Sequence, residues 1–285
     1  MKRRHIKDIS ENTTFELYDA RIMPMEDNGL SHFALVDSLM NEAGRHQKSM
    51  LHFWPTKKFV FLGMQDTKLP YFSDALAVLD ESDYDYIVRN SGGLGVVSDQ
   101  GILNVSLIIP NKDMDDISID DGYEIMYSLI QDMLDVPVDA VEIPDSYCPG
   151  DFDLSIGGQK ISGISQRRRS GALAIMLYLS LEGDQEQRSQ MMKRFYKEGL
   201  KGKDSKWHFP AIDPEVMVNL DDALDYPVTV DSMQTAFIES LESFGGHVQE
   251  GEYSVEILSD YEIEEENMIK RNQRMLGDHF KMKRG

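Results

Sequence analysis

Two adjacent glycines, Gly157 and Gly158, constrain the fold of this chain more than any other feature of the sequence. They separate two short runs, 153–156 and 159–164, in which apolar and polar residues alternate. A two-residue turn between antiparallel strands needs positive φ at both central positions, and glycine adopts such angles without strain. The pattern therefore predicts a β-hairpin that carries Lys160 on its second strand.

The only cysteine, Cys148, precedes this hairpin and is followed by a Pro-Gly pair that marks a bend. We therefore expect Cys148 on a loop, where its side chain can approach that of Lys160. A free cysteine is most often a small buried hydrophobic residue, and that interpretation stays open. The polar neighbours and the positive charge of Lys160 and of residues 167–169 favour a nucleophile instead, because nearby cations stabilise the reactive thiolate.

A second glycine-rich segment runs from Arg89 to Gly95 and contains Ser91, Gly92 and Gly93. Such a run fits a tight turn between strands as well as it fits a binding loop. Because its glycines have no side chains, the backbone amides of this segment can approach a bound acyl or carboxyl oxygen closely.

Charge and composition exclude several classes of function. The 285 residues include 29 basic and 50 acidic side chains, for a formal net charge of −21, which repels nucleic acids and anionic membranes. A single cysteine excludes an intrachain disulfide, and the seven histidines lack the spacing of a zinc site, so we expect no metal. The sequence has no P-loop, no signal peptide and no apolar run of the roughly 20 residues that span a bilayer. These features predict a cytosolic protein.

The hydrophobic periodicity predicts alternating groups of helices and strands. We expect helices over 30–47, 71–80, 121–134, 185–198, 231–244 and 260–280, with Asp121 and Asp231 at the start of two of them. We expect strands over 51–54, 59–63, 84–89, 96–97, 102–109 and 172–181, the first two paired as a hairpin, and an irregular segment over 199–228. This order predicts an α+β fold whose mixed sheet is mostly antiparallel and is flanked by helices.

Several motifs in a fixed order resemble the biotin and lipoate protein ligase and octanoyltransferase superfamily. They are the segment 89–93, Asp99, the segment 103–106, and the segment 157–163 with Lys160. The resemblance covers roughly residues 30–250. It implies a fold of the biotin/lipoate ligase catalytic-domain type over 1–250, and a C-terminal helical extension over 251–285 packed on the same domain.

The cysteine before the lysine hairpin resembles the cysteine-dependent octanoyltransferases more than the ATP-dependent ligases, which commonly carry histidine where this chain has Ser98. The most similar members move octanoyl from the glycine cleavage H protein to lipoyl domains of 2-oxoacid dehydrogenases. The alternatives are an octanoyltransferase that uses octanoyl acyl carrier protein, an ATP-dependent lipoate-protein ligase, and an inactive module that binds acyl-lysine or a cofactor.

The resemblance also implies roles for individual residues. Cys148 and Lys160 would be catalytic, with no cofactor: Cys148 would form an acyl thioester, and Lys160 would stabilise charge and move a proton. The residues expected to bind the substrate are Arg89, Ser91, Gly92, Gly93 and Gly163. An apolar tunnel would hold the octanoyl chain.

The lipoyl domains that the resemblance implies as acceptors are commonly acidic. Docking of such a domain on this acidic protein would therefore require a local basic patch. The run Arg167–Arg169 is the candidate that the sequence offers. Its alternative interpretation is a solvated charge run with no partner.

Overall fold

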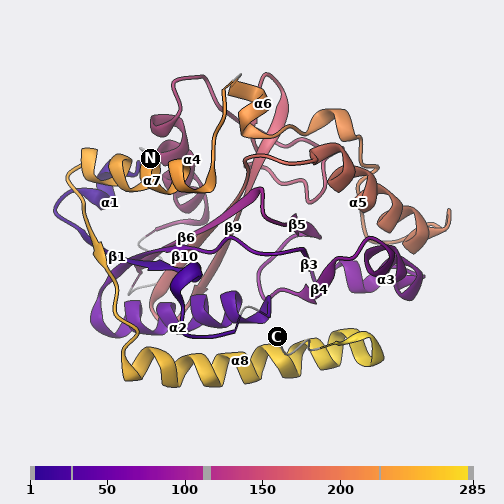
Figure 1. The fold of residues 1–285 in the computed structure, drawn as a ribbon, viewed down its shortest axis with the longest axis horizontal. Coiled ribbons are helices and arrows are strands. Elements are labelled where there is room, and N and C mark those ends of the chain that lie inside the picture. Colours follow the sequence, from indigo (N-terminus) through magenta and orange to yellow (C-terminus); the bar gives the residue numbers. More distant parts are fainter. Residues whose placement is uncertain (1–3, 27, 112–116, 225, 282–285) are drawn as a thin grey trace.

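A computed structural model describes residues 4–26, 28–111, 117–224 and 226–281. Its centre is an eight-stranded mixed sheet in the order β11-β1-β2-β6-β10-β9-β8-β7. Helices α4 and α7 cover one face of this sheet and helices α2 and α8 the other, with α3 and α5 at one end (Figure 1). In the described chain no helix is both long enough and apolar enough to cross a membrane.

The strands of the large sheet are β1 (Thr14–Asp19), β2 (Ser49–Phe53), β6 (Ile102–Pro110), β7 (Asp139–Ala140), β8 (Leu154–Ile156), β9 (Gln159–Arg169), β10 (Ala172–Ser180) and β11 (His247–Glu250). The second, three-stranded sheet consists of β4 (Asp85–Val88), β3 (Phe59–Leu62) and β5 (Val96–Ser98). The helices are α1 (Lys7–Ser10), α2 (Leu30–His46), α3 (Phe72–Glu81), α4 (Ile119–Met133), α5 (Gln185–Leu200), α6 (Leu220–Leu224), α7 (Val230–Ser243) and α8 (Val255–Leu276).

The predicted α+β class and mostly antiparallel sheet are confirmed, since β1 pairs in parallel with β2 and β11 while the other pairs of the large sheet are antiparallel. The central hairpin is confirmed too. Strands β8 and β9 pair across Gly157 and Gly158, whose φ values are +57° and +83°.

Alternation along the central strand β10 separates the two layers. Leu173, Ile175, Leu177 and Leu179 face the core that includes α4 and α7. Ala172, Ala174 and Met176 point to the opposite face and pack with α2 and α8. Both faces of β10 are therefore buried, as its apolar sequence predicts.

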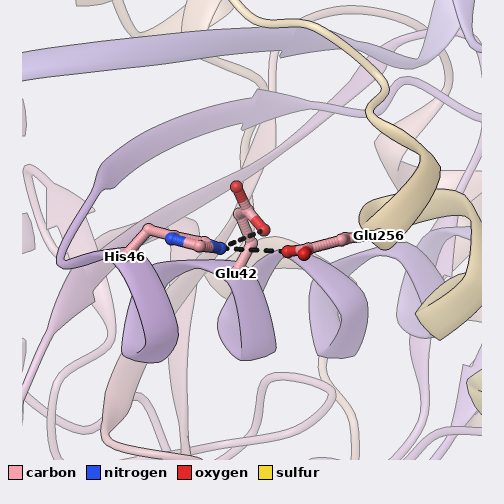
Figure 2. A group of neighbouring side chains, drawn as sticks. All are labelled: Glu42, His46 and Glu256. Atoms are coloured by element: carbon pink, nitrogen blue, oxygen red, sulfur yellow. Dashed lines mark hydrogen bonds and ion pairs between the residues drawn. The ribbon is translucent and has the colours of Figure 1, made fainter.

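An ion-pair cluster joins the C-terminal end of α2 to the N-terminal end of α8. His46 Nε2 lies 3.0 Å from a carboxylate oxygen of Glu256 and 3.6 Å from one of Glu42 (Figure 2). These three side chains could also hold a metal ion. Lys48 and Arg45 already pair with the same carboxylates, so the structure accounts for the cluster as a tie between two helices.

The predicted boundary between a catalytic domain over 1–250 and a C-terminal extension over 251–285 stays a prediction.

The predicted hairpin between 51–54 and 59–63 is wrong. Strand β2 pairs with β1 and β6, so both of its edges are occupied, while β3 belongs to the small sheet. Pro55 follows β2, and the chain crosses there from one sheet to the other.

Two predicted helix starts are also wrong, each because a residue of the first turn was taken as the cap. Ser118 caps α4 and forms a capping box with Asp121 at the third position. Thr229 caps α7 in the same way with Ser232, so Asp231 lies inside the helix. The last helix spans Val255–Leu276 rather than 260–280, and α6 lies in the segment predicted to be irregular.

Candidate functional site

A cavity of about 220 Å³ lies on the α2 side of the large sheet, where the small sheet closes over it. All seven residues predicted as site residues line this cavity. They are Cys148, Lys160, Arg89, Ser91, Gly92, Gly93 and Gly163. The structure therefore brings together two glycine-containing segments that are far apart in the sequence.

Cys148 lies on the loop before β8, as predicted, and it is partly exposed. Its backbone adopts a left-handed conformation with φ +50°. Two donors from the 89–95 loop point at its sulfur: the backbone N–H of Leu94, 3.2 Å from Sγ, and Nη2 of Arg89, 3.4 Å from Sγ. The sulfur of Cys148 is therefore the point where the cysteine loop and the 89–95 loop meet.

Gly93 makes this approach possible. Its φ is +95°, and a Cβ there would lie 2.8 Å from the sulfur of Cys148 and 2.5 Å from Nη2 of Arg89. The position therefore excludes a side chain both by backbone conformation and by contact. Gly92 is different, since nothing lies within 4 Å of a Cβ built on it.

Ser91 and Gly163 occupy other walls of the cavity. Ser91 is buried, and its hydroxyl makes no hydrogen bond within the described part of the chain. At Gly163 a Cβ would lie 3.8 Å from Nζ of Lys160, an ordinary contact distance.

Lys160 is 2% exposed, and its amine is fully engaged. Nζ lies 2.8 Å from a carboxylate oxygen of Asp153 and donates to Ser146 Oγ at 3.0 Å. It also donates to the backbone carbonyls of Tyr147 at 3.1 Å and Cys148 at 2.9 Å. Lys160 thus holds the backbone of the cysteine loop in place.

We expected the side chain of Lys160 to approach that of Cys148. In the structure Lys160 contacts the backbone carbonyl of Cys148, while Arg89 and Leu94 contact its sulfur. Asp153, the ion-pair partner of Lys160, was missed as a site residue. Burial raises the pKa of the Asp153 carboxyl, and the nearby ammonium of Lys160 opposes that shift. An acidic residue next to the lysine hairpin is the signal that could have revealed this pair.

The cavity extends from the cysteine across the strands of the sheet. Gly163 on β9 is opposite Tyr178 on β10, Tyr178 is opposite Asn104 on β6, and the amide of Trp54 bonds to the carbonyl of Asn104. This row covers three strand spacings, or roughly 14 Å. Its far end is walled by aromatic side chains, namely Phe33, Trp54 and Phe61. Such a wall suits an apolar chain, whose burial contributes about 0.8 kcal/mol per methylene.

The arginines at 167–169 do not form the free basic patch that the sequence suggested, and they are not a solvated run. Arg167 and Arg169 both pair with Asp37, at 2.5 and 2.9 Å, and Arg169 also pairs with Glu264. Arg168 points to the other face of the sheet and donates to the carbonyls of residues 117 and 118.

Comparison with known protein families decides the family. The model of the lipoyl protein ligase A/B catalytic domain matches residues 28–242. The chain belongs to this family. The match includes both glycine-containing segments and the cysteine loop that surround the cavity.

Curated relatives in the family are similar over most of the chain. An octanoyl-[GcvH]:protein N-octanoyltransferase of Lysinibacillus sphaericus is 36% identical over 278 residues, which cover 96% of this chain and 100% of the relative. The protein of that name from Geobacillus kaustophilus is 42% identical over 76% of this chain and 77% of its own. A lipoyl-[GcvH]:protein N-lipoyltransferase of Listeria monocytogenes is 38% identical over 87% and 91% of the two chains.

Solved structures of the family share the fold. A lipoate-protein ligase A bound with ATP superposes with a TM-score of 0.69 at 18% identity, covering 94% of this chain and 99% of that one. At this level of identity the likeness shows the fold alone, and it confirms the predicted catalytic-domain type.

Proposed function

We propose that this protein transfers an octanoyl group from a lysine of the glycine cleavage H protein to the target lysine of lipoyl domains in 2-oxoacid dehydrogenases. The observation that carries the proposal is the contact of Cys148 Sγ with Arg89 and with the Leu94 amide, at a cavity with an aromatic far wall. Relatives 36–42% identical to this chain bear the name of that activity.

In the first step the thiolate of Cys148 attacks the carbonyl carbon of the octanoyl-lysine amide of the donor. The C–N bond breaks, and the donor lysine leaves as an amine after receiving a proton. Lys160, whose ammonium lies against the carbonyl of Cys148, supplies that proton in our scheme. The enzyme then carries octanoyl as a thioester on Cys148.

In the second step the amine of the acceptor lysine attacks the thioester, and the C–S bond breaks. The proton released by the new amide returns to Lys160, and the thiolate is regenerated. Because one lysine amide is exchanged for another, the overall reaction is nearly balanced and requires no nucleotide. We place this reaction in the cytoplasm and assign it no cofactor.

A second acyl group is favoured by one relative. The Listeria monocytogenes protein is named a lipoyltransferase, so lipoyl is the alternative cargo of the same cavity. Octanoyl acyl carrier protein as the donor, ATP-dependent ligation, and an inactive acyl-lysine- or cofactor-binding module remain the alternatives to be separated by experiment.

The test offers the enzyme four acyl sources in parallel, each with unmodified lipoyl domain, and follows that domain by intact mass. The sources are octanoylated H protein, lipoylated H protein, octanoyl acyl carrier protein, and octanoate with ATP. We expect octanoylated H protein to modify the lipoyl domain fastest. Faster transfer from the carrier protein, or modification only with ATP, would contradict the proposed donor, and no transfer from any source would indicate an inactive module.

A further inference from the structure

The last third of α8 carries two arginines without an acidic partner. In the described chain no carboxylate lies within 4.0 Å of the guanidinium of Arg271 or Arg274. Arg274 is exposed and Arg271 half-buried. Three residues apart on one helix, they lie on the same face. Lys270 beside them is paired with Glu266 at 2.9 Å.

Arg167 on β9 extends this group. Burial lowers the pKa of Arg271, and repulsion by Arg274 and Arg167 lowers it further, as expected for cations held close together. Arg169 is the fourth arginine of the cluster. Two carboxylates, Asp37 and Glu264, pair with Arg167 and Arg169, and none pairs with Arg271 or Arg274, so the cluster of four arginines keeps a net positive charge.

This cluster contacts the backbone of the 89–95 loop, which lines the cavity. Nε of Arg271 donates to the carbonyl of Arg89 at 3.2 Å, and Nη1 of Arg167 donates to the carbonyl of Asn90 at 2.9 Å. The next residues along the chain, Ser91 and Gly92, line the cavity. The unpaired charges therefore lie next to a loop that forms one wall of the cavity.

We propose that the face formed by Arg271, Arg274 and Arg167 docks the acidic surface of the lipoyl domain that presents its lysine to Cys148. This inference rests on the proposed function. A chain with a net charge of −21 repels an acidic partner over most of its surface, so a local excess of positive charge orients the encounter. None of the three arginines lines the cavity, and an exposed helix face suits a macromolecule better than a small anion.

The experiment measures binding of unmodified lipoyl domain to the full-length enzyme by titration calorimetry at low and at high salt. The Arg274→Glu variant reverses one exposed charge that makes no ion pair in the described chain. Lys193→Glu makes the same change in charge at an exposed position on α5, away from the cavity, and is the matched control. Arg271→Gln, which keeps a polar side chain beside the carbonyl of Arg89, is the second variant.

We expect Arg274→Glu to weaken binding at low salt by about tenfold and Lys193→Glu to change it little, with the difference shrinking at high salt. Equal binding by all variants, or no binding by the parent, would overturn the inference. The inference would also be overturned if Arg274→Glu changed the oligomeric mass, or the binding to anionic vesicles, and left the binding to the lipoyl domain unchanged. Transfer by the parent is measured separately, so failure of docking and failure of the proposed function give different results.

Discussion

Two cations lie beside Cys148, and they do different things. Lys160 is 12 residues away in sequence, is almost fully buried, and contacts the backbone of the cysteine loop. Arg89 is 59 residues away and donates to the sulfur itself. Nearness in sequence pointed to Lys160 as the partner of the thiol, while the folded chain gives that contact to Arg89. The comparison separates a cation that holds the backbone of the cysteine loop from one that contacts the sulfur.

The largest effect should come from removing the buried cation. Lys160→Met leaves the carboxylate of Asp153 buried without its partner, so we expect the free energy of unfolding to fall by about 3–5 kcal/mol. Urea unfolding measures this loss. The double variant Lys160→Met/Asp153→Asn is the control, because it removes the unpaired charge and should recover much of the stability. A single variant as stable as the parent would show that the pair does not hold the loop.

Arg89→Gln should instead affect the thiol more than the fold. Its loss removes a charged donor from the sulfur, so alkylation of Cys148 by iodoacetamide at neutral pH should slow by about tenfold. The matched control is Arg194→Gln, the same substitution at an exposed arginine of α5. An unchanged alkylation rate in Arg89→Gln would assign stabilisation of the thiolate to other groups.

The third prediction concerns the pH dependence of stability and Asp66, which supports the Arg89 loop from behind. This buried carboxylate accepts hydrogen bonds from the Gly63 amide and from the hydroxyl of Tyr196, which in turn accepts one from Gly95. Burial raises the pKa of Asp66 from 3.8 to about 7, so the folded chain keeps a proton that the unfolded chain releases.

Between these two pH values unfolding releases that proton, and the contribution of Asp66 to stability falls as pH rises, by at most roughly 1.4 kcal/mol per unit. We expect the free energy of unfolding of Asp66→Asn to lose this slope between pH 4 and about 7. Urea unfolding of both proteins across that range measures the difference. Parallel pH profiles would mean that Asp66 is already ionised in the folded state over this range.

The parts of the fold that depend on local sequence were predictable. The Gly157-Gly158 turn, the apolar strand β10 and the amphipathic helix α2 follow from backbone preference and periodicity within a few residues. The strands β1 and β11 were not found, because they pair in parallel across more than 230 residues, as between Thr14 and His247. Only the complete sheet determines that register.

The candidate site was predictable to a similar extent. The sequence identified the residues around the cavity through the hairpin signal at Gly157-Gly158, the glycine-rich segment 89–95 and the resemblance to a known superfamily. It missed Asp153, the role of Arg89 beside the sulfur, and the unpaired arginines of α8, since each depends on which side chains meet in the folded chain.

The central claim is that octanoyl passes through a thioester on Cys148, and intact mass spectrometry tests it most directly. The enzyme is incubated with octanoylated H protein and no acceptor, then digested to locate any adduct. We predict partial labelling by one octanoyl group on the peptide that contains Cys148, discharge when unmodified lipoyl domain is added, and neither labelling nor transfer in Cys148→Ala. Transfer by Cys148→Ala at the parent rate without an adduct would contradict covalent catalysis at this residue.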